Sequence, residues 1–312
     1  MIYQKLGNIE APASAVGMGT WNIGNQWGEM TDRDAEEIVN AALENGITLF
    51  DTAESYGTPH GLSEIRLGKA LKGKRDGLIL VSKCGHWGMR SGQPVPLTTP
   101  DMIRICVHSS LGRLRTDLID VMLSHQEVIT DELAKIYIEG FRALQGEGFI
   151  KEYGISTTKI DTLKRFYELS DGEMTVVEAD YSLLNDTVEK DGFLDFCIEK
   201  NISVLTRGPL HQGLLSGRYD RNTVFTDSVR SAFNEGGRRH EEFVEMMDRL
   251  DALKPKLADI QDMDLPTYAI RYLISQKANV FAIPGATSVR QIVSNAKAGE
   301  RKLTEAELSF VK

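Results

Sequence analysis

The stretch TLFDTAESYG, residues 48–57, changes character halfway along its length. Its first half is a short apolar run, which predicts a buried strand that closes with Asp51. Tyr56 follows in a segment of small and turn-forming residues, and a helical pattern then covers residues 63–73, with Ser63 as its predicted N-cap. The stretch therefore predicts a strand–loop–helix unit with polar side chains where the strand ends.

The same order of elements recurs along the whole chain. The apolar runs that predict strands are residues 14–20, 48–53, 78–83, 118–125, 153–156, 175–183, 202–210 and 279–286. The helical patterns that follow them are residues 32–46, 63–73, 100–115, 131–148, 159–170, 189–201, 241–260 with 265–277, and 288–299, with a short last helix at 304–312. Eight such units without interposed hairpins predict an α/β fold, a (β/α)8 TIM barrel in a single domain over residues 1–312.

The alternative architecture is an open, doubly wound sheet. That fold should carry a GxGxxG fingerprint at its first strand–helix turn, and the chain contains none. The closed barrel is therefore the favoured prediction.

Composition limits the function classes. The 312 residues are 41% hydrophobic and 26% charged, with a net charge of −9, which argues against nucleic-acid and anionic-membrane partners. Three widely spaced cysteines, Cys84, Cys106 and Cys197, predict free, mostly buried thiols in a reducing compartment. The histidines lack metal-ligand spacing, so no metal site is expected, and the N-terminus resembles no signal peptide, so we expect a cytoplasmic protein.

Polar side chains stand at the ends of three consecutive predicted strands. Asp51 closes the second strand, Lys83 the third and His125 the fourth, with Tyr56 in the loop after the second. Active sites of such barrels lie at the carboxyl ends of the strands. An ammonium group beside a phenol lowers the phenol pKa from about 10. These four residues therefore predict a general acid aimed at a developing alkoxide.

Several segments then resemble the aldo-keto reductase superfamily. They are FDTAESYG, VSK, the Leu-Ile-Asp to Leu-Ser-His run of the fourth strand, and FAIPGATSVRQIVSN near the C-terminus. The resemblance implies a (β/α)8 barrel that binds NADPH, or NADH, without a dinucleotide fingerprint. It implies that Tyr56 is the general acid–base, that Asp51 and Lys83 tune it, and that His125 orients a small carbonyl or alcohol substrate.

The resemblance also implies a set of cofactor-binding residues. They are Thr20, Trp21, Asp51, Ser156, Thr157, Glu178, Arg207, Gly208, Pro209, Leu210, Gln212, Gly217, Ile283, Gly285, Ala286, Thr287, Gln291 and Asn295. Three depart from the usual pattern, because Thr157 replaces Asn, Glu178 replaces the Gln that holds the nicotinamide amide, and Arg207 replaces an aromatic residue. Arg290 and the helix start near Ser288 favour NADP(H), with NAD(H) possible.

Some features leave alternatives open. Trp21, Trp27 and Trp87 fit either ordinary loop packing or an aromatic wall of a substrate pocket. The polar segment 211–240 fits either a solvated loop or a flap over the cofactor. An NADPH-binding regulatory subunit with little turnover is the alternative to a carbonyl-reducing enzyme.

Overall fold

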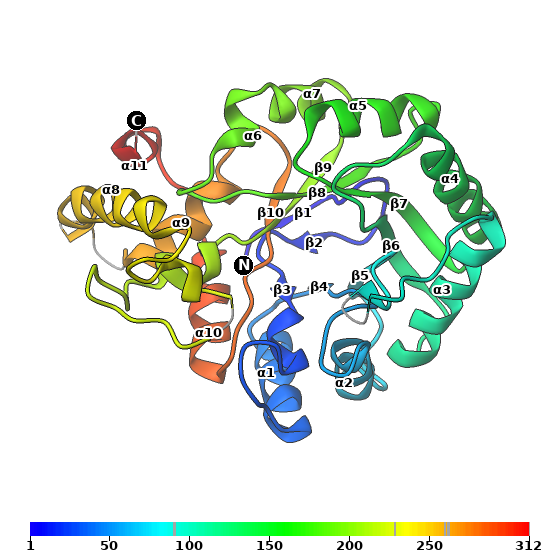
Figure 1. The fold of residues 1–312 in the computed structure, drawn as a ribbon, viewed down its shortest axis with the longest axis horizontal. Coiled ribbons are helices and arrows are strands. Elements are labelled where there is room, and N and C mark those ends of the chain that lie inside the picture. The colour runs from blue at the N-terminus through cyan, green and yellow to red at the C-terminus, as the bar shows by residue number, and fades with distance from the viewer. Residues whose placement is uncertain (90–91, 228, 259, 261–262, 312) are drawn as a thin grey trace.

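Eight parallel strands form the centre of the molecule (Figure 1). The structure is a computed structural model that describes residues 1–89, 92–227, 229–258, 260 and 263–311. The strands follow in chain order as β3 (Met18–Gly19), β4 (Leu49–Asp51), β5 (Ile79–Cys84), β6 (Ile119–Ser124), β7 (Ile150–Ser156), β8 (Val176–Asp180), β9 (Ser203–Arg207) and β10 (Val280–Ala282). Parallel bridges from Val16 to Ala282 and from Gly19 to Gly285 close the sheet, so the predicted (β/α)8 barrel is confirmed.

Helices surround this sheet (Figure 1). They are α1 (Asp32–Glu44), α2 (Leu62–Ala70), α3 (Pro100–Leu114), α4 (Asp131–Gly146), α5 (Ile160–Leu169), α6 (Thr187–Lys190), α7 (Phe193–Glu199), α8 (His240–Ala258), α9 (Leu265–Ile274), α10 (Val289–Ala298) and α11 (Glu305–Leu308), with short 3-10 turns η1 (Trp21–Gly24), η3 (His211–Ser216), η4 (Ser231–Phe233) and η5 (Ser309–Val311). The predicted helices 241–260 and 304–312 each include a position, 259 and 312, that lies outside the described residues.

Apolar side chains pack on both sides of the strands, which is why the strands read as continuous apolar runs. One buried cluster fills the barrel interior and includes Leu49, Val81, Leu123 and Phe281. A larger cluster lies between the sheet and the helices. The three cysteines are buried free thiols, as predicted. Among the described helices, none combines the length and apolar character needed to cross a lipid bilayer.

An N-terminal hairpin was not predicted. β1 (Tyr3–Gln4) pairs antiparallel with β2 (Ala13–Ser14), so a two-stranded hairpin precedes the eight strand–helix units. Leu6 and Ile9 lie between the two strands and belong to the cluster that fills the barrel interior. Each strand has only two residues, too few for an alternating pattern to be recognised.

Two helix predictions need correction. The N-cap of α2 is Gly61, not Ser63, because the buried Ser63 hydroxyl instead donates to the Thr20 carbonyl at 2.8 Å. The helix predicted over 189–201 is split into α6 and α7 at Gly192, which has φ +83°. Thr31, which directly precedes the predicted helix 32–46, caps α1 through a capping box with Asp34.

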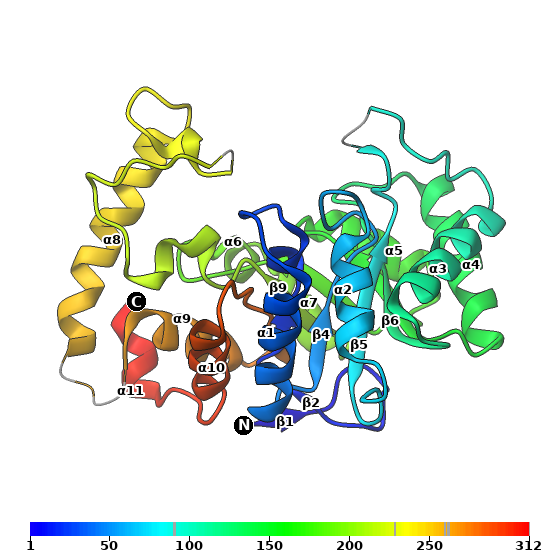
Figure 2. The same ribbon diagram turned by 90° about the horizontal axis from the view of Figure 1, so that it is seen from below.

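The long loops gather at one end of the barrel (Figure 2). The loop after β5 and the segment between β9 and α8 stand on opposite sides of this end, while the β1–β2 hairpin lies at the other (Figure 2). The side chains that follow Asp51 and Ser124 therefore meet at the loop-rich end, where barrel active sites lie.

The close packing of β7 against β8 yields a stability prediction. A methyl group on Gly154 would lie 1.7 Å from the Val176 carbonyl oxygen, so Gly154→Ala forces the two strands apart. We expect it to lower the free energy of unfolding by about 1–3 kcal/mol, the usual cost of overpacking, in a urea titration. The control is Gly112→Ala in α3, where the added methyl meets no atom within 4 Å. It should instead stabilise slightly, and equal effects would contradict the packing account.

Candidate active site

The four predicted catalytic side chains come together at the loop-rich end. Asp51 ends β4, Lys83 lies near the end of β5, and His125 follows β6 directly. Lys83 Nζ donates to Asp51 Oδ1 at 2.8 Å and Oδ2 at 2.6 Å, and lies 3.4 Å from the Tyr56 hydroxyl. The arrangement places an ammonium group between a carboxylate and a phenol, as the sequence predicts.

Lys83 is completely buried. Its ammonium group also donates to the Thr52 carbonyl at 3.0 Å and lies 3.1 Å from Glu178 Oε2. Although burial lowers the Lys83 pKa, Asp51 and Glu178 outweigh it and raise that pKa above its usual range. Lys83 is therefore a permanent cation at neutral pH.

The acidity of Tyr56 differs from the expectation. Burial raises the pKa of Tyr56 to about 12, although Lys83 acts in the opposite direction. Asp51 and Glu178 raise it as well. The expected lowering by Lys83 is present, but burial outweighs it, so Tyr56 carries its proton throughout the neutral range.

His125 is held as a neutral imidazole. Burial lowers its pKa well below the usual value, and His86, Lys83 and Arg207 lower it further. The His86 ring stacks on His125 with centroids 4.0 Å apart, and the Tyr56 ring meets His125 edge-on at 6.0 Å. A neutral ring beside the Tyr56 phenol has one N–H with which to hold an oxygen atom.

Glu54 organises the loop that carries His86, and no sequence pattern marked it as a functional residue. Its Oε1 accepts backbone N–H groups from Gly85, His86 and Trp87 at 2.5, 2.9 and 3.0 Å. It is almost completely buried, within the quoted stretch itself. Three convergent amides fix the start of the loop after β5.

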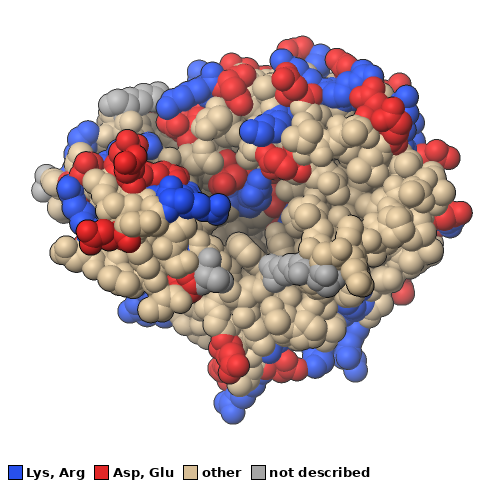
Figure 3. Space-filling view, in the orientation of Figure 1, with Lys and Arg blue, Asp and Glu red and all other residues tan. Residues whose placement is uncertain are grey.

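A cavity of about 1070 Å³ opens beside these residues. Figure 3 shows a hollow near the centre of one face with both basic and acidic side chains at its rim. Asp51, Tyr56 and His125 line the cavity. Eleven further predicted residues also line it: Trp21, Arg207, Gly208, Pro209, Leu210, Gln212, Ile283, Gly285, Thr287, Gln291 and Asn295. Thr20, Lys83, Ser156, Thr157, Glu178, Gly217 and Ala286 are not among its lining residues.

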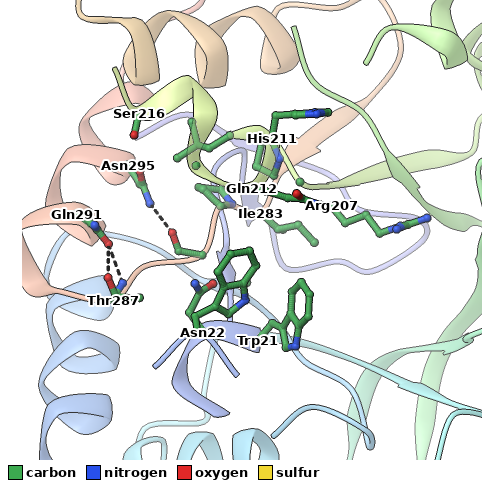
Figure 4. A pocket seen from close by; sticks show the side chains of 18 of the residues that line it. Trp21, Asn22, Arg207, His211, Gln212, Ser216, Ile283, Thr287, Gln291 and Asn295 are labelled. Atoms are coloured by element: carbon green, nitrogen blue, oxygen red, sulfur yellow. Dashed lines mark hydrogen bonds between the residues drawn. The ribbon is translucent and has the colours of Figure 1, made fainter. Parts of the chain in front are cut away.

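Hydrogen bonds hold the side chains on the α10 side of the cavity (Figure 4). Gln291 Oε1 accepts from the Thr287 amide at 2.7 Å, and the Asn295 amide donates to the Gly285 carbonyl at 3.4 Å. Gly285 lies so close to Asn22 that an added methyl would meet Asn22 Oδ1 at 1.7 Å. Two loops far apart in the sequence therefore form one wall.

The cavity wall suits a large polar ligand. Several of its buried polar atoms make no hydrogen bond within the described residues: Trp21 Nε1, Trp27 Nε1, His125 Nδ1, Arg207 Nε, His211 Nε2 and Gln212 Oε1. Buried polar atoms ordinarily have partners, so these are free to bind a ligand. The volume and the polar groups fit a nicotinamide dinucleotide.

The Arg207 side chain, which replaces an aromatic residue of the family pattern, is held in an ion pair. Its Nη2 lies 3.0 Å from Glu127 Oε2, and its side chain is 39% exposed. Glu127 in turn accepts from the Thr158 amide at 2.9 Å, while the Thr157 hydroxyl donates to the Glu127 carbonyl at 2.6 Å. Thr157 thus supports the loop that holds Arg207.

The segment 211–240 lies against the cavity. Arg230 stacks on the Trp27 ring at 5.6 Å and so joins this segment to the loop after β3. Trp21 and Trp27 line the cavity, whereas Trp87 packs under Arg113. Lining residues that the sequence did not assign to a cofactor include Asn22, Arg218, Tyr219 and Arg239.

Comparisons with known proteins agree with this geometry. The Aldo/keto reductase family profile matches residues 15–312. The NADH-specific methylglyoxal reductase of Escherichia coli (strain K12) is 29% identical over 322 residues, covering 98% of this chain and 96% of that protein. The holo form of aldo-keto reductase AKR11C1 from Bacillus halodurans has a TM-score of 0.80 at 29% identity, covering 100% of this chain and 95% of that chain.

A further solved structure carries a bound nucleotide. The aldo/keto reductase from Klebsiella pneumoniae in complex with NADP and acetate has a TM-score of 0.73 at 25% identity, covering 99% of this chain and 94% of that chain. Because the family profile spans nearly the whole sequence, the protein belongs to the aldo/keto reductase family of oxidoreductases, which act on carbonyls and alcohols.

Proposed function

We propose that the protein is an NAD(P)H-dependent enzyme that interconverts a carbonyl compound, an aldehyde, ketone or sugar, and its alcohol. One observation carries the proposal. Lys83 Nζ joins the Asp51 carboxylate to the Tyr56 hydroxyl, 3.4 Å away, beside a cavity of about 1070 Å³. A poised phenol at a cavity of this size suits proton transfer to a bound carbonyl.

Four segments would hold the cofactor. They are the start of η1 with Trp21, the run Arg207 to Leu210, the turn at Gln212, and residues 285–295. A reduced nicotinamide supplies the hydride when it is bound. The unpartnered Trp21 Nε1 and Gln212 Oε1 offer one donor and one acceptor to the ligand.

The protein's own contribution is to hold and move one proton. Tyr56 gives the proton of its hydroxyl to the carbonyl oxygen, and the Lys83 ammonium, 3.4 Å away, stabilises the phenolate that is left. In the direction of oxidation the phenolate takes the alcohol proton. Asp51 keeps Lys83 in place, and the neutral His125 ring donates to the same oxygen.

NADP(H) is the favoured cofactor, and NAD(H) is the second choice. Arg290 lines the cavity near the N-terminus of α10, where Ser288 is the N-cap. A helix N-terminus with an arginine nearby suits a phosphate group. The Klebsiella pneumoniae structure contains NADP, whereas the Escherichia coli relative is NADH-specific, so relatives of both kinds exist.

Tyr56→Phe tests the proton donor. We expect carbonyl reduction to fall by at least about 100-fold, because the general acid is lost, while NADPH binding stays near normal. Steady-state turnover of a panel of aldehydes and ketones and a binding titration measure the two quantities. Tyr167→Phe on α5 is the control and should retain turnover. Wild-type rates in Tyr56→Phe would remove Tyr56 from the mechanism, and NADPH binding without turnover in the unaltered protein would favour a regulatory subunit.

Arg290→Ala tests the cofactor preference. We expect the Kd for NADPH to rise roughly tenfold, since one charge-assisted contact to a phosphate is lost, while the Kd for NADH stays unchanged. Calorimetric titration with each nucleotide measures both constants. An equal loss for the two nucleotides would mean that Arg290 does not meet the phosphate that distinguishes them.

A further inference from the structure

Glu178 is a second carboxylate beside the buried Lys83 ammonium group. It is a fully buried residue of β8, and neither of its carboxylate oxygens makes a hydrogen bond within the described residues. Lys83 is a close charged neighbour, with its Nζ 3.1 Å from Glu178 Oε2. Asp51 Oδ2 lies 2.6 Å from the same nitrogen. Two carboxyl groups therefore share one ammonium group.

The charges around Lys83 do not balance if both carboxyls are ionised. One cation and two anions leave a net negative charge among side chains that are almost completely buried. The histidines cannot supply the missing cation, because burial lowers the pKa of both His86 and His125. Arg207 is already paired with Glu127. An uncompensated buried charge is costly, so binding a proton is the favourable way to remove it.

The titration of Asp51 agrees with this balance. Burial raises the pKa of its carboxyl well above the usual value, and the neighbouring Glu178 carboxylate raises it further. Lys83 opposes both effects without overcoming them. In most buried carboxylate–ammonium pairs the cation dominates; here burial, together with the second carboxylate, reverses the outcome.

We propose that Glu178 is a second counter-ion of Lys83, and that Asp51 and Glu178 hold one proton between them at neutral pH. The proton is assigned to the two carboxyls together, because one ammonium group faces both of them. Glu178 is thereby a positioning residue that acts on Tyr56 through Lys83. When the shared proton leaves, the added negative charge keeps the Tyr56 phenol protonated, because carboxylates raise the Tyr56 pKa.

Infrared spectroscopy of the full chain without cofactor tests the shared proton directly. A protonated carboxyl has a carbonyl stretch distinct from that of a carboxylate, and it shifts in heavy water. We expect one such band at neutral pH that is absent in both Glu178→Gln and Asp51→Asn, because each variant leaves one carboxylate to balance Lys83. Glu37→Gln, an exposed helical position paired with Arg33, should keep the band. If no protonated-carboxyl band of the wild type disappeared in either variant, the two carboxyls would not share a proton. Loss of the band in only one of the two variants would also overturn the proposal.

The pH dependence of stability gives a second measurement, which needs only the near-isosteric Glu178→Gln. The native pair binds more protons than the unfolded chain, whose Asp pKa is near 3.8. Wild-type stability should therefore fall as the pH rises from about 4 to the native pKa of the pair, by up to tenfold in the unfolding constant per pH unit relative to Glu178→Gln. Parallel stability curves would overturn the proposal.

The influence on Tyr56 rests on the proposed function and is tested separately. Carbonyl reduction requires protonated Tyr56, so it declines as the pH passes the Tyr56 pKa. Glu178→Gln removes a negative charge that raises this pKa, and the alkaline limb of the pH–rate profile should move to lower pH by about 1 unit. An unmoved limb would overturn the influence on Tyr56. Failure of Tyr56→Phe to lose turnover would refute the proposed function while leaving the infrared and stability results unaffected.

Discussion

The buried ion pair between Lys83 and Asp51 is the constraint on which the loop-rich end of the barrel depends. Lys83 is completely enclosed, so its ammonium group needs partners supplied by neighbouring strands. Asp51 supplies two of the hydrogen bonds, and the Thr52 carbonyl supplies a third. Removing one partner of such a pair typically costs about 3–5 kcal/mol. The same contacts fix Lys83 where Tyr56 and Glu178 meet it, so stability and chemistry share one set of atoms.

The barrel and its four catalytic candidates were accessible from sequence because each depends on local pattern. Strands buried on both faces give continuous apolar runs, and parallel strand ends must meet at one edge of the barrel. The hairpin of β1 and β2 gave no comparable signal, because its pairing involves only two residues from each strand. Ser63 was misassigned because its hydroxyl has a long-range partner, the Thr20 carbonyl, that no local pattern announces.

The electrostatics of the site needed three-dimensional information. The sequence places Lys83 near Tyr56 but says nothing about how deeply the phenol is buried, and burial decides the direction in which its pKa moves. Glu178 stands 95 positions from Lys83, yet lies 3.1 Å from its nitrogen. Likewise, Glu54 was visible in the quoted stretch, but its three amide partners come from the loop after β5.

The proposed hydride transfer depends on nucleotide binding at the cavity. Trp21 and Trp27 line the cavity, so their fluorescence reports directly on a ligand that enters it. The decisive measurement is a titration of this fluorescence with NADPH and then with NADH. We predict saturable quenching by both nucleotides, with NADPH binding more tightly than NADH. Absence of quenching and of binding with both nucleotides would contradict it.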